Sequence, residues 1–544
     1  DGRPNELAIR IDSAVIAGRA HEPAAWEGAG TVNWESLAIR KAPHMYGWDI
    51  LPRIVSAGLW RGVRLETIPA TRFGDCYVVV TGVNPAANRA SIAIDWHLIT
   101  NELNLDDWQL SVTLSHDHAV VHDEVIPLMG NHGRHRLSLN EARLWWPRGY
   151  GAQPLYDLVL TMRDGTGAIR AERRERIGLR TVRLERSQIT SDETPGEFRF
   201  IVNGEPIFVK GTNWVPLDAL HSRDSAHLDT VFEMVTDLNC TMLRCWGGNV
   251  YEDTPFFDAC DRAGVLVWQD FALACALYPQ TDAFAAALRR EAEYIIKKLR
   301  NHPCLALWAG NNEIDAFCEG WLGYRIDPGT DRTSREVLAT AVRLHDPCRD
   351  YLPSSPYHSP EWVAQGRDAR REPEAHLWGP RDDFKGSFYA DSSAHFVSEI
   401  GYHGCPDRAT LEAMLDTDRL WPWQDNDQWL THAVRPHPAH TDCSYRIALM
   451  ARQAAFLFGA APENLDDFID ASQISQAEAL KFFIEWARMG KWRRTGMLWW
   501  NLRDGWPVIS DAVVDYYNRK KRAYATIKRL QANVCAMVAE AKDG

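Results

Sequence analysis

Apolar and polar residues alternate with a period of two through much of the first 187 positions. The alternation is clear in NELAIRIDS (residues 5–13) and in GLWRGVRLETI (58–68), with a turn-rich aromatic segment between them. A period of two predicts strands that bury one face and expose the other. Residues 1–68 are therefore predicted to form a first β unit.

Longer alternating stretches follow between residues 69 and 187. They are CYVVVTGV (76–83), SIAIDWHLI (91–99), LDDWQLSVTL (105–114) and the run from 155 to 184. The last run contains RDGTG, which is a hairpin sequence. Short strands with turns between them predict a β-sandwich.

The pattern changes near residue 200, where short apolar runs, typical of strands buried on both faces, replace the alternation. These runs lie at 207–216, 241–249, 265–271, 304–313, 375–379, 395–401 and 496–507. Helical patterns separate most of them, such as residues 254–264 and residues 282–300, the latter with Asp282 as the predicted N-cap. This alternation predicts parallel strands and favours a (β/α)8 barrel. An open doubly wound sheet is the alternative, but no Gly-rich phosphate-binding turn follows the first strand.

Polar and aromatic side chains cluster where these apolar runs end. Parallel strands present their carboxyl ends at one face, where barrel enzymes build their active sites. The candidate catalytic and binding residues at these ends are Asn213, Trp214, Arg244, Trp246, Asp270, Asn312, Glu313, His376, Glu399 and Asp504.

Glu313 and Glu399 form the kind of carboxylate pair that glycoside hydrolysis requires. One carboxyl acts as acid and then as base. The other is the nucleophile when the two are about 5–5.5 Å apart, or activates water when they are farther apart. Asn312 is expected to hydrogen-bond a sugar 2-hydroxyl. Arg244 is expected to orient the nucleophile and to keep its pKa low, which leaves Glu313 with the higher pKa of an acid.

Each of these residues also has a structural interpretation. A Glu after a strand is commonly a solvated loop residue, and Gly310 with the two following Asn residues could form an ordinary turn, because Gly and Asn tolerate positive φ. Arg244 taken alone favours a structural ion pair, and His376 taken alone favours a structural histidine. The placement of all of them at successive strand ends is what favours a catalytic site.

Composition narrows the possible functions. The 544 residues are 45% hydrophobic and 24% charged, as in a globular protein with several domains. The net charge of −13, without a basic stripe, argues against nucleic acids and anionic membranes as partners. The 23 tryptophans supply large aromatic faces, which suit the packing of sugar rings.

Neither a metal nor another cofactor is indicated by the sequence. Eleven irregularly spaced cysteines indicate reduced thiols rather than a disulfide framework or a Cys-x-x-Cys metal site. No stretch approaches 18 uncharged apolar residues, so no membrane span is expected. The chain starts at Asp1 without a signal-peptide pattern, so a cytoplasmic location is expected.

Taken together, the sequence resembles glycoside hydrolase family 2, and most closely its β-mannosidase branch. The stretches that carry the resemblance are KAPHMYGWDILPR (41–53), NGEPIFVKGTNWVPLD (203–218), residues 238–279 with RCWGG, RNHPCLALWAGNNE (300–313), HFVSEIG (395–401) and residues 496–519. The resemblance runs through essentially the whole chain.

The resemblance implies a retaining exo-β-glycosidase, most closely a β-mannosidase, that removes terminal non-reducing β-D-mannosyl residues by double displacement without a cofactor. It also implies three domains. Residues 1–68 would be the C-terminal part of a jelly-roll domain, residues 69–187 an immunoglobulin-like sandwich, and residues 188–544 the catalytic (β/α)8 barrel. The implied partner is a glycoside or oligosaccharide substrate.

The resemblance further implies roles for individual residues. Glu313 would be the acid/base, Glu399 the nucleophile and Asn312 the contact to the 2-hydroxyl. Asp49 matches a jelly-roll loop residue that hydrogen-bonds the distal hydroxyls of the terminal sugar, and Trp500 would lie beneath its ring. The remaining pocket-wall or supporting positions are Asn213, Arg244, Trp246 and Asp270.

Two departures from the family pattern leave the sugar open. Where β-mannosidases of the family usually carry a Trp-His pair, this sequence has residues 374–389, in which His376 and Trp378 are the candidate binding residues. NLRD (501–504) replaces the more usual QLND and adds Arg503, a candidate for binding a sugar carboxylate. A glucosaminide, galactoside or uronide is therefore an alternative substrate. A non-catalytic carbohydrate-binding protein is an alternative function.

Overall fold

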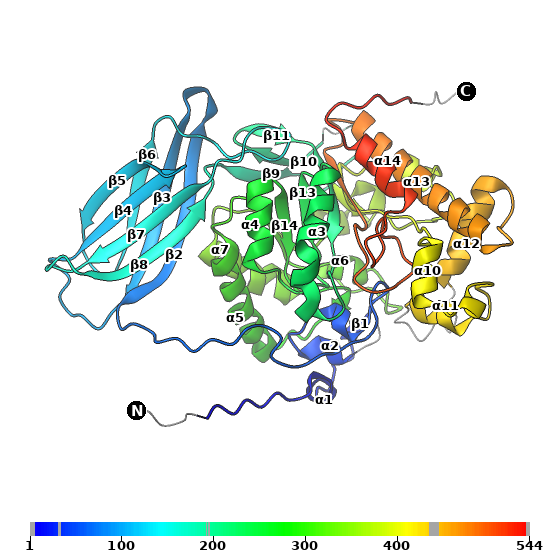
Figure 1. Ribbon diagram of the computed structural model, residues 1–544, viewed down its shortest axis with the longest axis horizontal. Helices are drawn as coiled ribbons and strands as arrows, with labels where there is room; N and C mark the ends of the chain where they lie inside the picture. Colours follow the sequence, from blue (N-terminus) through cyan, green and yellow to red (C-terminus); the bar gives the residue numbers. More distant parts are fainter. Residues whose placement is uncertain (1–5, 31–33, 192, 194–195, 435–444, 540–544) are drawn as a thin grey trace.

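The computed structural model describes residues 6–30, 34–191, 193, 196–434 and 445–539. A β region lies at one end, a curled parallel sheet with surrounding helices occupies the centre, and further helices cover the other end (Figure 1). The N-terminal segment runs along one side of the centre before the chain enters the β region (Figure 1).

The central sheet contains eight parallel strands from the described part of the chain. Their order is β17-β16-β14-β13-β12-β20-β19-β18. The strands are β12 (Val209–Trp214), β13 (Met242–Cys245), β14 (Leu266–Asp270), β16 (Leu305–Ala309), β17 (Tyr351–Leu352), β18 (Glu374–His376), β19 (Phe396–Glu399) and β20 (Gly496–Trp499). The pairing of β20 with β12 brings the last strand back beside the first.

The two outer strands of this sheet, β17 and β18, are joined by no backbone ladder in the described residues. Instead, the Ser355 hydroxyl, just beyond β17, donates a hydrogen bond of 2.8 Å to Glu374 of β18. The sheet is therefore curled like a barrel without being closed by strand pairing. The predicted seven apolar runs are confirmed as strands. The short β17 was not predicted, because its two residues form no apolar run.

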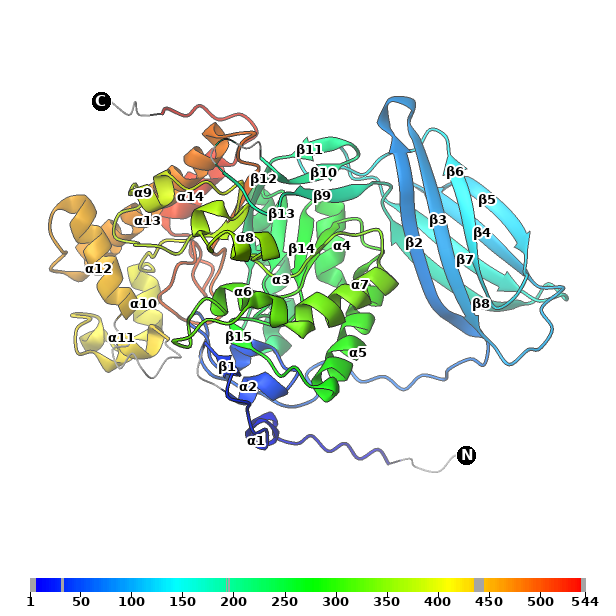
Figure 2. The same cartoon turned by 180° about the vertical axis from the view of Figure 1, so that it is seen from behind.

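Helices between successive strands cover the outside of the curled sheet (Figure 2). They include α3 (Asp224–Asp237), α4 (Thr254–Ala263), α5 (Asp282–Leu299), α6 (Ile314–Phe317), α7 (Ala339–His345), α8 (Pro360–Ala364) and α9 (Ser387–Ala390). The predicted end of α4 at Gly264 is confirmed, and that glycine adopts a left-handed φ of 72°. The predicted N-cap of α5 is wrong by one residue. Thr281 is the cap, because its hydroxyl accepts the Phe284 N–H.

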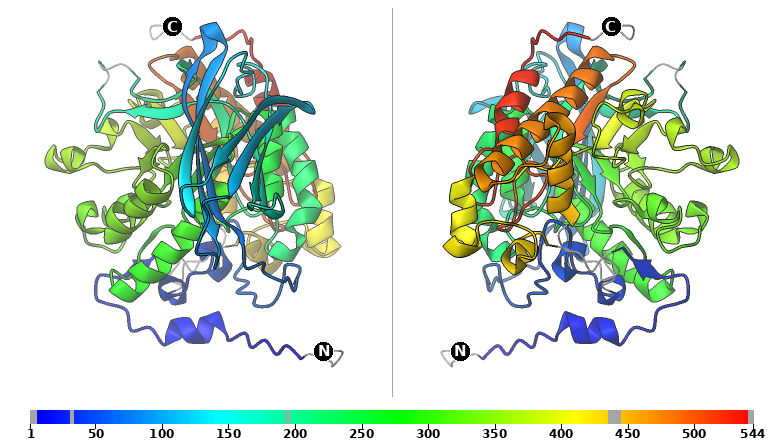
Figure 3. Two further views of the ribbon diagram at one scale, coloured as in Figure 1. Left: turned by 90° about the vertical axis from the view of Figure 1, so that its left-hand side faces the viewer. Right: turned by 90° about the vertical axis from the view of Figure 1, so that its right-hand side faces the viewer.

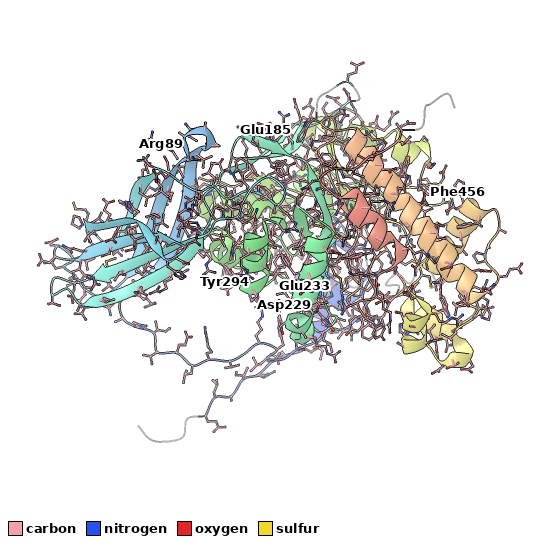
Figure 4. The ribbon with its side chains drawn as sticks, turned by 45° about the horizontal axis from the view of Figure 1, so that its top comes forward. Arg89, Glu185, Asp229, Glu233, Tyr294 and Phe456 are labelled. Carbon is pink, nitrogen blue, oxygen red and sulfur yellow. The ribbon has the colours of Figure 1, made fainter. Side chains whose placement is uncertain are left out.

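The far end is a helical layer that follows β19 (Figure 3, right). It contains α10 (Arg408–Met414), α11 (Asp427–His432), α12 (Tyr445–Phe458), α13 (Leu465–Met489) and, after β20, α14 (Arg522–Leu530). Outer faces of the helices carry exposed side chains, and Tyr294 of α5 and Phe456 of α12 project from the surface (Figure 4). No helix among the described residues is long and apolar enough to cross a bilayer.

The β region consists of two antiparallel sheets that share one apolar core (Figure 3, left). One sheet has the order β2-β3-β6 and the other β5-β4-β7-β8. The strands are β2 (Arg72–Asn84), β3 (Arg89–Ile99), β4 (Gln109–His116), β5 (Ala119–Pro127), β6 (His132–Leu139), β7 (Tyr156–Arg163) and β8 (Ile169–Ile177). The strands predicted from alternation are confirmed, whereas the more polar β5 and β6 were not predicted.

A small antiparallel sheet lies between the β region and the central sheet. Its strands are β9 (Val182–Arg186), β10 (Phe198–Val202) and β11 (Glu205–Ile207). Phe198 and Phe200 of β10 contact Trp268 and Phe396 of the curled sheet through stacked, tilted and edge-on ring pairs. This sheet therefore covers the amino-terminal end of the parallel strands with apolar side chains.

The strands predicted within residues 1–68 are wrong. Residues 6–13 and 58–68 have no strand structure, while residue 5 lies outside the described residues. Their apolar side chains find no opposing sheet among the described residues, and Leu7 and Leu65 are 76% and 100% exposed. Alternation alone does not make a strand when no partner strand is present.

The N-terminal segment is nevertheless fixed to the central region. It contains α1 (Ala14–Arg19), α2 (Glu35–Ala38) and the two-residue strand β1 (Gly28–Ala29). β1 pairs antiparallel with β15 (Ala276–Leu277), and the Gly30 N–H donates to the Cys275 carbonyl at 2.8 Å.

Candidate active site

A pocket of about 280 Å³ opens at the carboxyl ends of the parallel strands. This volume is near the lower end of the range for small-molecule sites. The lining residues that follow strands are Trp246, Asn312, Glu313, Trp378, Glu399 and Trp500. Loops and the N-terminal segment supply Gly30, Trp48, Asp49, Cys275, Trp321, Arg381 and Asp511.

Arg244 lies beneath this pocket, fully buried at the end of β13. One guanidinium nitrogen donates to Glu399 at 2.6 Å and to Asn213 at 2.9 Å. The other donates to Asp270 at 2.8 Å and to Asn312 at 2.8 Å. The planar guanidinium of Arg244 therefore joins the ends of five strands: β12, β13, β14, β16 and β19. A flexible Lys ammonium is poorly suited to make these contacts together.

Glu399 is held at both carboxylate oxygens. Arg244 donates to Oε1 at 2.6 Å, and the Trp378 indole N–H donates to Oε2 at 2.9 Å. Both groups can only donate hydrogen bonds. They therefore stabilise the ionised carboxylate more than the protonated carboxyl. These two contacts orient the side chain and favour its charged form.

Glu313 sits at a left-handed backbone position with a φ of 59°, between β16 and α6. Its N–H donates to the Ser355 carbonyl at 2.9 Å, which fixes this conformation. Non-Gly residues adopt this region at a cost and often at functional sites. The residues of the preceding Gly-Asn-Asn do not have positive φ. Gly310 is needed for another reason, because an added Cβ would lie 2.2 Å from the Pro353 carbonyl oxygen.

Two side chains contact the Glu313 carboxyl directly. His376 Nδ1 lies 2.6 Å from Oε1, and the Cys275 thiol donates to Oε2 at 3.1 Å. The Asn312 amide donates to the same sulfur at 3.3 Å. His376 Nε2 lies 3.1 Å from the Ser355 hydroxyl. Glu313 is thus positioned by neutral groups rather than by a cation.

The carboxyl groups of Glu313 and Glu399 face each other across a short gap. His376 Nδ1 lies 3.5 Å from Glu399 Oε2 as well as 2.6 Å from Glu313 Oε1. A carboxylate oxygen of each Glu lies within 4.8 Å of the other. The two acids selected from the sequence therefore meet at one pocket.

Burial raises the pKa of both carboxyls above the usual 4.5. We expected Arg244 to keep the pKa of Glu399 low, but burial is the larger effect. Burial also lowers the pKa of His376 to about 3, so this imidazole is neutral at ordinary pH. Because Glu399 receives the charged donor and the indole donor, these contacts favour the ionised form of Glu399 and a shared proton on Glu313.

Aromatic rings form the pocket walls. Trp246 packs edge-on against Trp48 and Trp500, with ring centroids 5.0 and 5.4 Å apart, and Trp378 lies 6.3 Å from Trp500. These rings leave an apolar wall for the C–H-rich face of a sugar beside the two carboxyls.

Some predicted binding residues stand behind the pocket rather than on its surface. Asn213 and Asp270 are buried and bond to Arg244. His376 is not part of the pocket wall and contacts the two carboxyls, Glu313 and Glu399, from behind. Trp214 points away, because its indole donates to Glu252 at 2.9 Å. Asp504 is likewise absent from the pocket wall and accepts a hydrogen bond from Ser510.

Arg503 also lies behind the wall, contrary to the expectation that it could bind a sugar carboxylate. It is 3% exposed and donates to the Leu217 carbonyl at 2.8 Å and to Asn518 at 2.6 Å.

The pocket includes residues that sequence analysis missed. Cys275, Trp321, Arg381 and Asp511 lie in loops between elements, where no apolar run marks their position. Arg381 lies 4.3 Å from the centre of the Trp378 ring and 3.9 Å from Asp511. Asp49, which was predicted, forms an ion pair with Arg446 of α12. Charged side chains therefore gather on one side of the pocket.

Three groups of side chains in the described residues are close enough to share a metal ion: Glu313 with His376 and Glu399, Asp258 with Asp261 and His302, and His122 with Glu124 and His135. In the first two groups a histidine bonds a carboxylate directly at 2.6 Å. At that distance the histidine nitrogen and the carboxylate oxygen bond each other, and no metal ion fits between them.

Known proteins with similar sequences share this architecture. Residues 76–180 match the family model of glycosyl hydrolases family 2. The chain is 34% identical, over 97% of its length, to beta-mannosidase B of Thermothelomyces thermophilus. It superposes on the crystal structure of a beta-D-mannosidase from Dictyoglomus thermophilum with a TM-score of 0.83 and 30% identity over 95% of the chain. The expected resemblance to glycosyl hydrolase family 2 is confirmed.

This chain spans less than two thirds of the length of these two relatives. The chain covers 63% of the Thermothelomyces protein and 62% of the Dictyoglomus protein. A more distant likeness is the structure of an exo-chitosanase of Amycolatopsis orientalis, with a TM-score of 0.64 and 19% identity over 85% of this chain and 53% of that one. At that identity the likeness concerns the fold alone.

Proposed function

We propose that this chain carries the catalytic site of a retaining exo-β-mannosidase, which removes terminal β-D-mannosyl residues from the non-reducing ends of glycosides. The proposal rests on the carboxylate oxygens of Glu313 and Glu399, which lie within 4.8 Å of each other in one pocket. Retaining glycosidases have carboxyls about 5–5.5 Å apart, whereas inverting enzymes need about 6.5–9.5 Å to admit a water. The sugar is suggested by the beta-mannosidases at 34% and 30% identity.

In the proposed first step, Glu399 attacks the anomeric carbon and Glu313 gives its proton to the departing oxygen. Arg244 and Trp378 hold the Glu399 carboxylate ionised and aimed. The neutral His376 beside Glu313 lets the proton stay on the acid until the bond breaks.

In the proposed second step, Glu313 takes a proton from water, and the water displaces Glu399 from the sugar. The anomeric configuration is retained, because two displacements occur at the same carbon. Both steps use side chains alone, so no cofactor is required.

The pocket suggests how the sugar is held. Asn312 lies beside the acid with its oxygen fixed by Arg244. Its amide would bond O2 of a sugar whose C1 lay between the two carboxyls. Trp500 and Trp246 would contact the ring face. Asp49 would bond the distal hydroxyls and make the enzyme exo-acting.

The architecture proposed for this function has three parts. Residues 1–68 would belong to a jelly-roll domain, residues 69–187 would form an immunoglobulin-like sandwich, and residues 188–544 would form a (β/α)8 barrel. The family match at residues 76–180 supports the second part, and the strand order of the curled sheet supports the third. The first part rests on the sequence resemblance alone, because residues 6–13 and 58–68 form no strands.

A second candidate keeps the mechanism and changes the sugar to a uronide. Arg381 lines the pocket and could pair with a sugar carboxylate. A glucosaminide would instead require an acid near C2, and Asp49 and Asp511 are the acids on the wall besides the catalytic pair.

A panel of 4-nitrophenyl β-glycosides, with proton NMR of the first released anomer, tests the proposal. Fastest hydrolysis of the mannoside with release of the β-anomer is expected. Preference for the glucuronide would favour the uronide alternative, and release of the α-anomer would contradict the retaining mechanism. Mannoside binding without turnover would favour a carbohydrate-binding protein.

A further inference from the structure

The two edge strands β5 and β6 bring three polar side chains together away from the pocket. β5 ends one sheet of the β region and β6 ends the other. His122 and Glu124 lie two residues apart on β5 and therefore point to the same face, while His135 comes from β6. The faces are the inner ones, because Ile126 and Leu137 continue them into the apolar core.

Distances within this cluster match those of ligands around one ion. Glu124 Oε2 lies 3.3 Å from His122 Nε2 and 3.2 Å from His135 Nε2. Two ligand atoms bound at 2.0–2.1 Å to a tetrahedral zinc ion are about 3.3 Å apart. All three ligand atoms lie within 4.8 Å of one another.

One nitrogen of each imidazole in this cluster, Nε2, makes no hydrogen bond. Nε2 of His122 and Nε2 of His135 are both buried, and neither makes a hydrogen bond. A buried polar nitrogen without a partner is costly, so such atoms normally have one in the protein or in solvent. Here the nearest polar atom from the protein is the Glu124 carboxylate oxygen. By contrast, His302 lies 2.6 Å from Asp261 and is satisfied directly.

The surroundings explain why no protein group fills the gap. The residues paired with this cluster across the neighbouring strands are Ile94, Val112 and Leu114, all fully buried. They offer no hydrogen-bonding side chain. Glu124 is partly exposed, which leaves a route for an ion and a bound water.

We propose that His122, Glu124 and His135 bind a divalent transition-metal ion, zinc by preference, that links the two sheets. Two imidazoles and a carboxylate with a fourth position for water are a common zinc ligand set. Ca²⁺ and Mg²⁺ prefer oxygen ligands and would bind poorly. On the opposite side of the β region, β2 packs against β8. The ion would hold together the side where no backbone ladder joins β5 to β6.

Metal binding by the full chain tests this site. After dialysis against a chelator, the protein is titrated with Zn²⁺ by calorimetry, and bound metal is counted by mass spectrometry. One equivalent of zinc is expected in the wild type. His122→Gln and Glu124→Gln should each weaken that binding at least tenfold. His132→Gln changes a neighbouring exposed histidine of β6 and should leave it unchanged.

Two further measurements keep the outcome decisive. Glu124→Gln preserves the shape of a partly exposed side chain and serves if His122→Gln fails to fold. Co²⁺ should give the intense visible absorption of a four-coordinate site in the wild type and His132→Gln but not in Glu124→Gln. Zinc bound with the same affinity by all variants, or no zinc bound by the wild type, would overturn the proposal.

Discussion

At the pocket, Glu399 accepts hydrogen bonds from Arg244 and Trp378, whereas on the β region Glu124 faces two imidazole nitrogens that make no hydrogen bond. The first cluster is complete without any added group, and its short contacts suit the holding and transfer of protons. The second is spaced for an ion. Similar residue types therefore serve different chemistry according to whether direct contacts or gaps separate them.

The largest expected effect comes from the nucleophile. Glu399→Gln removes the attacking charge with little change in shape, and kcat/KM for a 4-nitrophenyl β-glycoside should fall on the order of 10⁴-fold or more. Glu172→Gln makes the same change on the exposed face of β8 and should leave the rate within about twofold. Near wild-type turnover by Glu399→Gln would contradict the assignment of Glu399 as the nucleophile.

The next largest effect is the difference in stability between variants of a buried and of an exposed arginine. Arg244→Met leaves the buried carboxylates of Asp270 and Glu399 without a cationic partner, which should lower the free energy of unfolding by about 3–5 kcal/mol. Arg134→Met breaks an exposed pair with Asp95 on the β region and should cost less than about 1 kcal/mol. Urea unfolding followed by tryptophan fluorescence measures both. Equal losses would show that Arg244 is not the centre of the pocket network.

Removal of the acid should depend on the leaving group. Glu313→Ala should lower kcat/KM about 10²–10⁴-fold for an alkyl glycoside but far less for a dinitrophenyl glycoside, which needs little protonation. In the wild type, activity should fall as pH rises through the Glu313 pKa, which burial places above 4.5. This alkaline limb should vanish in Glu313→Ala. Its persistence would assign the limb to another group.

The smallest effect is expected from the thiol beside the acid. Because the Cys275 thiol donates to the Glu313 carboxylate, it lowers the pKa of Glu313. Cys275→Ala should therefore move the alkaline limb of kcat/KM upward by up to about one pH unit. Cys405→Ala, which removes a buried thiol from the helical layer, is the matched control. A downward shift would contradict this contact.

Strands and the residues at their ends could be predicted from the sequence where burial requires a run of apolar residues. Strands buried on both faces, such as β14 and β16, consist of apolar runs, and the polar residues at their ends can be found by position alone. Glu313, Asn312 and Glu399 could be selected this way. The two-residue β17 and the polar β5 and β6 lack that pattern, because partner strands rather than their own residues define them.

The rest of the site depends on contacts between distant segments. Arg381 and Asp511 lie in loops with no periodic signal, and nothing in the sequence pairs them. Trp214 and Arg503 illustrate the opposite case. Trp214 ends β12 and Arg503 follows β20, yet both side chains point away from the pocket. Side-chain direction at a strand end depends on one residue of register, which apolar runs do not fix.

Pairing of β1 with β15 has a consequence for dissecting this protein. The loop that carries Cys275 is tied down by Gly30, and Asp49 completes one wall, so segments more than 200 positions apart share one small cavity. An isolated fragment of residues 188–544 would keep Glu313 and Glu399. It would lose the N-terminal segment around Gly30, which holds the loop with Cys275 beside Glu313. The parallel sheet and its helices alone would therefore not reproduce this pocket.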